Sequence, residues 1–312
     1  EQVDATAPSA VQALPELKTL RVVMDQQFPD GPSGPPAKRP MGHDVIETPH
    51  ERDARYGIKR GQSWSGYKAQ VTETCDEETP HLVTDIKVTG ALDNDSPELD
   101  DIQERLLEQG TPPGEHLVDQ GYMSGANLAK SEKRGIELLG IPLADTQGPE
   151  GFKQTDFQID EETETAICPQ GQKNGTWSTK KDPDGGPPSI LVRFPAKICR
   201  DCVHFGQCTK SKQGRSLTLG PYRDLLQAKR AEAESEAYQK RLHRRAGIEG
   251  TISELVRGYG FRQSRYRGLQ KAQMQAYITA TALNLRRAIR WLTSEEHESC
   301  LKKRTTTCLS CC

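Results

Sequence analysis

The spacing of apolar and polar residues changes several times between residues 66 and 143. Apolar and polar residues alternate through GYKAQVTETC and HLVTDIKVTGA, which the polar turn DEETP separates. Alternation is typical of strands with one buried face, so these segments predict an antiparallel hairpin. The next segment, SPELDDIQERLLEQG, predicts a helix with Ser96 as N-cap and Gly110 just past its end. A short apolar run (HLVD), a helical stretch (NLAKSEKRG) and a second apolar run (IELLGIPL) follow, and together these elements indicate a mixed α/β fold.

The flanking segments have other patterns. Leu14–Phe28 predicts a short helix, and the Pro/Gly-rich stretch PDGPSGPPAKRP after it predicts a linker. Tyr222 to Leu292 is rich in helix-forming residues, with breaks expected around Gly258–Gly260 and near Gly268. Residues 150–222 have Gly/Pro clusters, four cysteines and short strand-like pieces (FQID, ETAIC, ILVRF), which indicate an insertion. We therefore expect five segments: 1–50, 51–149, 150–222, 223–292 and a disordered cysteine-rich tail, 293–312.

Composition excludes several classes of protein. The 312 residues include 42 Lys and Arg, 44 Asp and Glu, and 34% hydrophobic residues, so the chain is neither collagen nor fully disordered. No apolar run approaches the roughly 18 residues that span a bilayer, and no membrane partner is expected. Charge is divided along the chain: residues 1–208 have a net charge of −14, and residues 209–312 have +12. This division favours an anionic partner for the basic part, nucleic acid above all, although a solvated helix surface would look the same.

Two carboxylates are candidates for chemistry. Asp119 ends the apolar run Leu117–Val118 before a glycine turn, a position that suits a metal ion at a sheet edge and equally suits a helix cap. Glu249 lies in a helical segment in which Arg241, Arg245, Glu249, Ser253 and Arg257 recur every four residues. A carboxylate framed by arginines is suited to a metal near a phosphate backbone; alternatively, it simply pairs with Arg245 one turn away.

Cysteines form a third constellation. Cys168 begins a C-P-x-G turn, and Cys199, Cys202 and Cys208 follow as C-x-x-C-x₅-C. Two such thiolate pairs can close a tetrahedral Cys₄ zinc site, in which His204 is a possible substitute ligand. The alternative is a set of reduced, buried thiols in a small β-rich insertion. Cys300, Cys308, Cys311 and Cys312 have no spacing that indicates a metal site.

Several motifs in a fixed order together resemble a known family. Five segments are similar to the C-terminal catalytic part of bacterial insertion-sequence transposases of the DDE type. In chain order they are GYKAQVTETC, VTGALDNDSPELDDI, HLVDQGYMSG, RRAGIEGTISELVRGYGFRQSRYRGLQKAQMQ and ALNLRRAIRWL. The resemblance covers roughly residues 51–292. It implies a ribonuclease-H-like fold, a mixed sheet with flanking helices, interrupted here by the cysteine-rich insertion that the family often carries.

The resemblance also implies roles for single residues. Asp119 matches the second catalytic Asp, Glu249 the catalytic Glu, and Arg245 and Arg257 its basic neighbours, although Leu242 stands where the family usually has Tyr. Three carboxylates would hold two Mg²⁺ (or Mn²⁺) ions for in-line phosphoryl transfer. The first Asp is expected upstream of residue 1, since Asp4, Asp25, Asp30, Asp44 and Asp53 all lie in unsuitable segments. On that expectation this chain binds DNA without cleaving it.

The basic segment predicts the partner. Basic and aromatic residues alternate in this segment, and its cations are Arg257, Arg262, Arg265, Arg267 and Lys271. Together with Arg241 and Arg245, these cations are suited to binding the phosphates of double-stranded DNA at transposon ends without recognising its sequence. A homo-oligomer on DNA and a cytoplasmic, nucleoid-associated place in a bacterium follow from the resemblance. Two alternatives stay open: a non-catalytic DNA-binding remnant stapled by zinc, and a ribonuclease-H-like nuclease unrelated to transposition.

Overall fold

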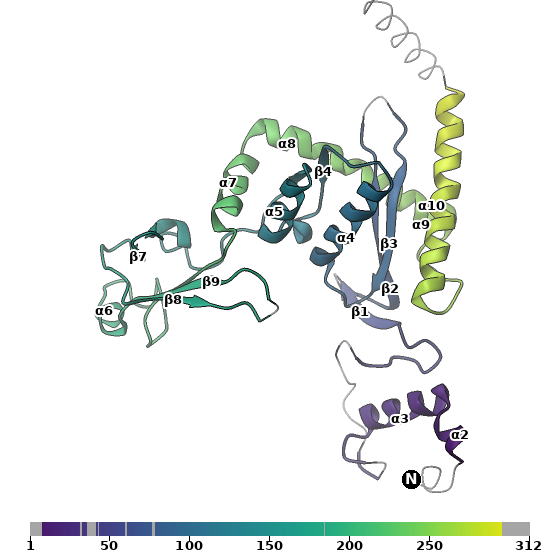
Figure 1. The fold of residues 1–312 in the computed structure, drawn as a ribbon, viewed down its shortest axis with the longest axis horizontal. Coiled ribbons are helices and arrows are strands. Elements are labelled where there is room, and N and C mark those ends of the chain that lie inside the picture. Colours follow the sequence, from purple (N-terminus) through teal and green to yellow (C-terminus); the bar gives the residue numbers. More distant parts are fainter. Residues whose placement is uncertain are drawn as a thin grey trace, which may run out of the picture. The chain divides into compact units, whose positions relative to one another are not determined.

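The structure is a computed structural model of the chain. It describes residues 8–31, 33–35, 42, 44–59, 61–76, 79–183 and 185–294. The chain divides into two compact units, one made of Glu1–Thr111 with Arg244–Cys312 and the other of Pro112–His243. Helices and several small sheets alternate along the sequence, which confirms the mixed α/β class (Figure 1).

The first unit is built on the predicted hairpin. Strands β2 (Gln62–Glu73) and β3 (Val83–Gly90) pair antiparallel, with Val71 opposite Ile86. A short strand that the pattern did not predict, β1 (Arg55–Lys59), pairs antiparallel with the first half of β2. It escaped prediction because its buried position is Gly57, whereas the apolar Ile58 is exposed. The sheet order is therefore β1-β2-β3.

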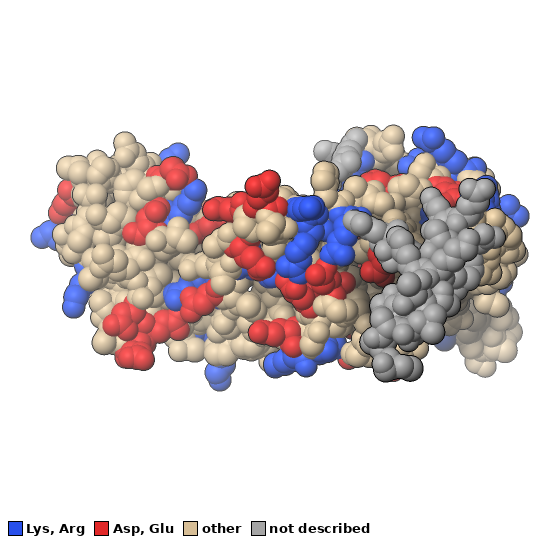
Figure 2. Space-filling model, turned by 90° about the horizontal axis from the view of Figure 1, so that it is seen from above, with Lys and Arg blue, Asp and Glu red and all other residues tan. Residues whose placement is uncertain are grey.

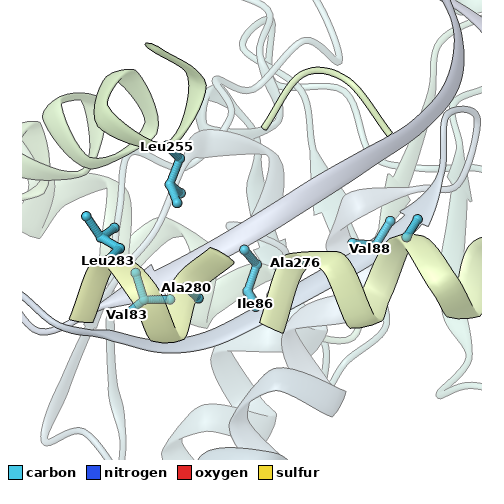
Figure 3. Close-up of a cluster of buried hydrophobic side chains, with 8 residues drawn as sticks. Val83, Ile86, Val88, Leu255, Ala276, Ala280 and Leu283 are labelled. Carbon is cyan, nitrogen blue, oxygen red and sulfur yellow. The ribbon is translucent and has the colours of Figure 1, made fainter. Parts of the chain in front are cut away.

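The core of this unit lies between β3 and two C-terminal helices. Val83, Ile86 and Val88 of β3 pack with Leu255 of α9 (Gly247–Tyr259) and with one face of α10 (Leu269–Leu292), as Figure 3 shows. That face of α10 carries Ala272, Ala276, Ala280 and Leu283. Small side chains at four-residue spacing let the helix approach the strand closely, and Figure 1 shows α10 running alongside β3.

Two amide side chains of α10 bond to the backbone of β3. Asn284 accepts from Val83 N and donates to Val83 O, both at 2.8 Å. Gln273 accepts from Val88 N at 2.7 Å and donates to Ile86 O at 2.7 Å. A side-chain amide has a donor and an acceptor, as a peptide group has, so these residues satisfy strand backbone groups as a neighbouring strand would. They fix α10 along the strand.

Helix α4 (Asp95–Glu108) follows β3 as predicted, but its N-cap is Asn94 and not Ser96. The Asn94 side chain accepts from Ser96 N at 3.1 Å, so Ser96 lies already inside the first turn. Both residue types cap well, and the pattern placed the boundary two residues late. Arg105, near the end of α4, forms a bidentate ion pair at 2.8 Å with the buried Asp85 of β3.

The N-terminal segment of the first unit holds α2 (Ser9–Gln12) and α3 (Pro15–Gln27). Helix α3 confirms the helix expected over Leu14–Phe28. Its buried residue is Thr19, whose hydroxyl bonds to Pro15 O, whereas Leu20, Val22 and Met24 are exposed. Parts of the linker after it lie outside the described residues.

The second unit begins with a parallel pair of strands, β4 (Glu115–Leu117) and β5 (Glu137–Leu139). Between them lies α5 (Gly125–Lys133), capped by Ser124. Helices α7 (Arg223–Ala233) and α8 (Glu236–His243) complete this part, where Leu139, Ala233 and Tyr238 form a small core. These strands and α5 agree with the predicted order.

The cysteine-rich segment of this unit is a small β structure. It contains β6 (Gln158–Asp160) paired with β7 (Thr165–Ile167), and a sheet of order β10-β9-β8 made from Ser216–Leu219, Ser189–Arg193 and Thr176–Lys180. A short helix, α6 (Ala196–Arg200), follows β9. Three of these strands match the predicted pieces, while β8 and β10 escaped prediction. Their core includes Phe157, Val192, Phe194 and Leu217.

Strands of the described residues fall into four separate sheets rather than one. The β1-β2-β3 sheet belongs to the first unit and the β4-β5 pair to the second. The ribonuclease-H-like topology therefore stays a prediction. Within the described part of the chain, no helix is both long and apolar enough to cross a bilayer.

The C-terminal helical region is interrupted more often than predicted. The break at Gly260, which adopts the left-handed conformation after α9, and the break at Gly268 before α10 are confirmed. Additional breaks occur near Ser235 and at a 3₁₀ turn, η3 (Arg244–Ala246). Residues 295–312, most of the expected tail, lie outside the described residues.

Candidate functional site

Asp119 lies two residues after the end of β4, where the sequence predicts the end of an apolar run. It is exposed and precedes the 3₁₀ helix η1 (Gln120–Tyr122), whose Tyr122 N bonds to the backbone oxygen of Asp119 at 3.0 Å. The Asp119 side chain does not cap that helix. The capping alternative therefore fails for η1, and the carboxylate stands at the end of the strand.

Glu249 lies in the first turn of α9 and is exposed. The helix is amphipathic, with Leu255 and Thr251 buried against the sheet of the first unit. Glu249 belongs to this first unit, whereas Asp119 belongs to the second. The two carboxylates therefore belong to different elements, Asp119 to the turn after β4 and Glu249 to α9.

The four-residue stripe expected from Arg241 to Arg257 does not lie on one helix. Arg241 is on α8 of the second unit, Arg245 is in η3, and Glu249 and Arg257 are on α9. The stripe was wrong because four-residue spacing keeps side chains on one face only in an uninterrupted α-helix. The 3₁₀ turn at Arg244–Ala246 breaks that geometry.

Arg241 forms ion pairs within its own unit. Its Nη2 donates to Glu115 Oε1 at 2.9 Å and also to Glu137. Glu115 and Glu137 face each other across the parallel pair β4-β5. Like charges directly opposite on paired strands repel, so the guanidinium between them stabilises the pairing.

Tyr238, three residues before Arg241, is also structural. It is 2% exposed, donates to Gly140 O at 2.8 Å and accepts from Gly140 N at 2.9 Å. Burial raises the pKa of this phenol above its ordinary value. Tyr238 thus anchors α8 to the end of β5.

A buried polar cluster that the sequence did not reveal joins α9, α10 and the hairpin. Arg287 of α10 donates to Glu73 at 3.2 Å, to His81 O at 2.6 Å, to Thr251 Oγ1 at 2.8 Å and to Glu254 at 2.9 Å. The Glu73 side chain is only 4% exposed, and it also accepts from Thr251. Glu73 and Arg287 are 214 residues apart in sequence, so no local pattern signals the pair.

The segment between α9 and α10 gathers the other predicted cations. Arg257, Arg262, Arg265, Arg267 and Lys271 are all exposed. Among the described residues no carboxylate forms an ion pair with any of the five. On the face of the molecule drawn in Figure 2, basic and acidic side chains are interspersed, so charge alone does not mark a binding surface there. The absence of described acidic partners sets this segment apart from Arg241 and Arg287.

The four predicted zinc ligands line one pocket. Cys168, Cys199, Cys202 and Cys208 surround it together with His204 and the aromatic rings of Phe152, Phe157, Phe194 and Phe205. Cys199 Sγ accepts a hydrogen bond from Arg215 N at 3.4 Å. Burial raises the pKa of the Cys208 thiol, and the nearby Cys199, Cys168 and Cys202 raise it further, whereas Arg215 lowers it.

The thiols do not have the geometry of a closed ligand set. No group of three or more His, Cys, Asp or Glu side chains in the described part of the chain is arranged to hold a metal ion. Cys168 begins a turn in which Gly171 N bonds to Cys168 O at 2.8 Å, and Cys202 N bonds to Cys199 O at 3.4 Å. The pocket therefore brings the predicted cysteines together in turns without showing tetrahedral geometry.

The comparison with protein families identifies the C-terminal part of the chain. Residues 167–289 match the family model of the transposase DDE domain. The resemblance to DDE-type transposases is confirmed. No curated protein and no solved structure gives a significant match to the chain.

The transposase DDE match places the predicted residues in two groups. It contains the four cysteines, Glu249 and the whole basic segment, and it begins after Asp119. Asp119 therefore depends on the sequence motif and on its position after β4.

Two of the aspartates considered for the first position have other places in the structure. Asp25 lies on helix α3, not at the end of a strand. Asp53 accepts from Leu269 N at 3.3 Å at the start of α10, where Glu51 accepts from Gly268 N at 3.0 Å. Carboxylates at a helix N-terminus bind its unpaired N–H groups, which gives Asp53 a structural role.

Proposed function

We propose that this chain is the DNA-binding and catalytic region of an insertion-sequence transposase, acting on the ends of its transposon. The family match supports a DDE transposase, and this family carries out DNA phosphoryl transfer. The observation that carries the proposal is the segment from Arg257 to Lys271. Its five cations are exposed and have no described carboxylate partner, and they lie within the matched region.

Phosphates are the ligands that such a segment suits. Each cation that neutralises a backbone phosphate releases condensed counterions, so binding falls steeply with salt and is largely independent of sequence. Arg245 lies in the turn just before α9 and is a further candidate. Arg241 already binds two glutamates, so we assign it to the fold rather than to DNA.

Asp119 and Glu249 are the proposed Mg²⁺ ligands. Both are exposed carboxylates at the start or end of a regular element, and hard oxygen donors suit Mg²⁺ or Mn²⁺. Bound ions would activate a water or a DNA 3′-hydroxyl and stabilise the leaving oxygen. The role of this chain's own residues is to supply negative oxygen ligands, and the role of the basic segment is to hold the DNA backbone.

The cysteine pocket is a proposed structural Zn²⁺ site. Four thiols that line one pocket supply the donor type and number that zinc prefers, and the N–H bond to Cys199 Sγ is the kind of interaction that orients a thiolate ligand. Zinc would cross-link and stabilise the small β segment from residue 150 to 222, whose own hydrophobic core is modest. The division into five segments, an oligomer on DNA and a nucleoid-associated place in a bacterium belong to the same proposal.

Duplex binding tests the proposal directly. We expect fluorescence anisotropy with a labelled duplex to show log K falling linearly with log salt concentration. Removing two charges with Arg262→Gln and Arg265→Gln should weaken binding equally for unrelated sequences and lower the slope by about 2. The matched control, Lys180→Gln with Lys181→Gln, removes two exposed charges from the other unit and should leave the slope nearly unchanged. An identical slope in the arginine variant would contradict the proposal.

Metal analysis tests the zinc site. We expect purified protein to contain about one zinc per chain, and Cys199→Ser to lose it together with the folded state of the insertion. Cys75 lies in the first unit, so Cys75→Ser is the control and should keep its zinc. A folded wild-type protein without zinc would contradict this part of the proposal.

A non-catalytic DNA-binding remnant is the second candidate, because no described group of three ligands assembles around Asp119 or Glu249. Nicking of a supercoiled plasmid separates the two candidates. This chain, which is expected to lack the first catalytic Asp, should not nick it, whereas a protein that also supplies that Asp should nick it in the presence of Mg²⁺ and lose this activity on Asp119→Asn or Glu249→Gln. Binding without nicking by the protein that has the first Asp would favour the remnant.

A further inference from the structure

Tyr266 is exposed in the middle of the basic segment. Its side chain is 54% exposed, and the neighbours on either side are Arg265 and Arg267, both exposed. A single exposed aromatic residue is common on protein surfaces and needs no special explanation. The setting of Tyr266 differs because hydrogen bonds hold the backbone of its loop and its neighbouring cations have no acidic partner among the described residues.

The loop around Tyr266 is anchored at both ends. Phe261 before it and Leu269 after it pack against the hydrophobic core of the first unit. Gly268 N donates to Glu51 at 3.0 Å, which fixes the end of the loop to the segment that precedes β1. The loop therefore begins and ends at fixed points.

Gln275 of α10 holds the middle of the loop. Its Oε1 accepts from Arg265 N at 2.8 Å, and its Nε2 donates to Gln263 O at 3.0 Å. Ser264 Oγ donates to Tyr266 O at 2.6 Å. Backbone hydrogen bonds of this kind order the loop before any ligand binds, so binding a ligand loses little conformational entropy in the loop.

We propose that Tyr266 stacks on an unpaired base of a DNA strand, while Arg265 and Arg267 bind the phosphates on either side of it. Aromatic rings flanked by cations are the surfaces on which unstacked bases bind, because the ring contacts the base and the cations neutralise the backbone. Inside a duplex both faces of each base are covered by its neighbours, so the ring can stack only where a base is unpaired. This inference rests on the proposed DNA binding and specifies its ligand as single-stranded or locally unpaired DNA.

Anisotropy with two labelled probes tests the proposal: a 20-nucleotide single strand and the same strand in a blunt duplex. Stacking contributes about 1–3 kcal/mol per base, so Tyr266→Ala should weaken single-strand binding about 5- to 150-fold and duplex binding by less than about twofold. Tyr266→Phe keeps the ring and should bind the single strand as the wild type does. Tyr277→Ala is the control, because Tyr277 is another exposed tyrosine, 47% exposed on α10, and should leave both affinities unchanged.

The salt dependence separates this inference from the function it rests on. Tyr266→Ala removes no charge and should leave the salt slope unchanged, whereas Arg265→Gln should lower it by about 1. Unchanged single-strand affinity in Tyr266→Ala, or an equal loss for both probes, would overturn the stacking proposal while Arg265→Gln still supports DNA binding. If the wild-type protein binds neither probe, both proposals fail.

Discussion

Two arginines of the same unit, Arg287 and Arg265, differ in whether a carboxylate partner neutralises them. Arg287 is largely buried and surrounded by Glu73, Glu254 and the backbone of His81. Arg265 is exposed and has no carboxylate partner among the described residues. Sequence alone treats both as basic residues on or near helices. The comparison shows that the acidic partner, and not the arginine, decides whether a cation holds the fold or remains available for a ligand.

The same contrast appears between tyrosines. Tyr238 is buried and bonds with both backbone groups of Gly140, whereas Tyr266 is exposed between two cations. A polar aromatic residue with satisfied hydrogen bonds stabilises the fold, and one without them offers a surface. Each prediction below tests one side of this contrast.

The largest effect is expected from Arg287→Met. Removing the guanidinium leaves Glu73 buried and uncompensated, and breaking such a pair costs about 3–5 kcal/mol. Urea denaturation followed by circular dichroism measures the loss in the free energy of unfolding. The double variant Glu73→Gln with Arg287→Met should recover part of that loss, because no charge is then left buried. A loss below about 1 kcal/mol would show that the cluster is solvated and that the contrast with Arg265 is weaker than the structure indicates.

A smaller effect is expected from Tyr238→Phe. Without the hydroxyl, the N–H and C=O of Gly140 lose their described partner in a buried position, which costs about 1–3 kcal/mol. Tyr266→Phe serves as the matched control and should change the free energy of unfolding by no more than about 0.5 kcal/mol. Equal effects of the two substitutions in urea denaturation would remove the distinction between the tyrosines.

The pH dependence of stability gives the third prediction. Burial, the hydrogen bond to Glu51 at 2.7 Å and the negative charges of Glu51 and Asp53 raise the pKa of Tyr67 well above its ordinary value. A raised pKa means that the folded state holds the proton more tightly than the unfolded state. The contribution of the protonated Tyr67 to the free energy of unfolding is therefore complete below about pH 10 and declines as the pH rises above that value. Denaturation at several pH values should show wild-type stability falling more steeply above pH 10 than that of Tyr67→Phe, and parallel curves would contradict the prediction.

Local patterns were sufficient for much of the fold. The β2-β3 hairpin, the helices α3, α4 and α5, the parallel runs that became β4 and β5, and the breaks at Gly260 and Gly268 all depend on periodicity and turn residues close together in sequence. Strands β1 and β8 escaped because they bury few apolar side chains, and β10 escaped because its clean alternation spans only four residues. The supposed stripe from Arg241 to Arg257 failed because nothing in its composition signals the 3₁₀ turn at Arg244–Ala246.

The site was less accessible to sequence analysis than the fold. Motifs pointed to Asp119, Glu249 and the four cysteines, which lie after β4, on α9 and around one pocket, and their roles stay predictions. The Arg287 cluster and the pairing of Arg241 with Glu115 and Glu137 depend on residues more than 100 positions apart. No local pattern can show which cations are neutralised in this way.

One measurement tests the central contrast most directly: the salt dependence of duplex binding by Arg265→Gln and Arg241→Gln. Each variant loses a single positive charge, but only Arg241 is paired, with Glu115 and Glu137. We predict that Arg265→Gln lowers the slope of log K against log salt by about 1 and that Arg241→Gln leaves it unchanged. Equal slopes in the two variants, or a lower slope for Arg241→Gln alone, would contradict the account.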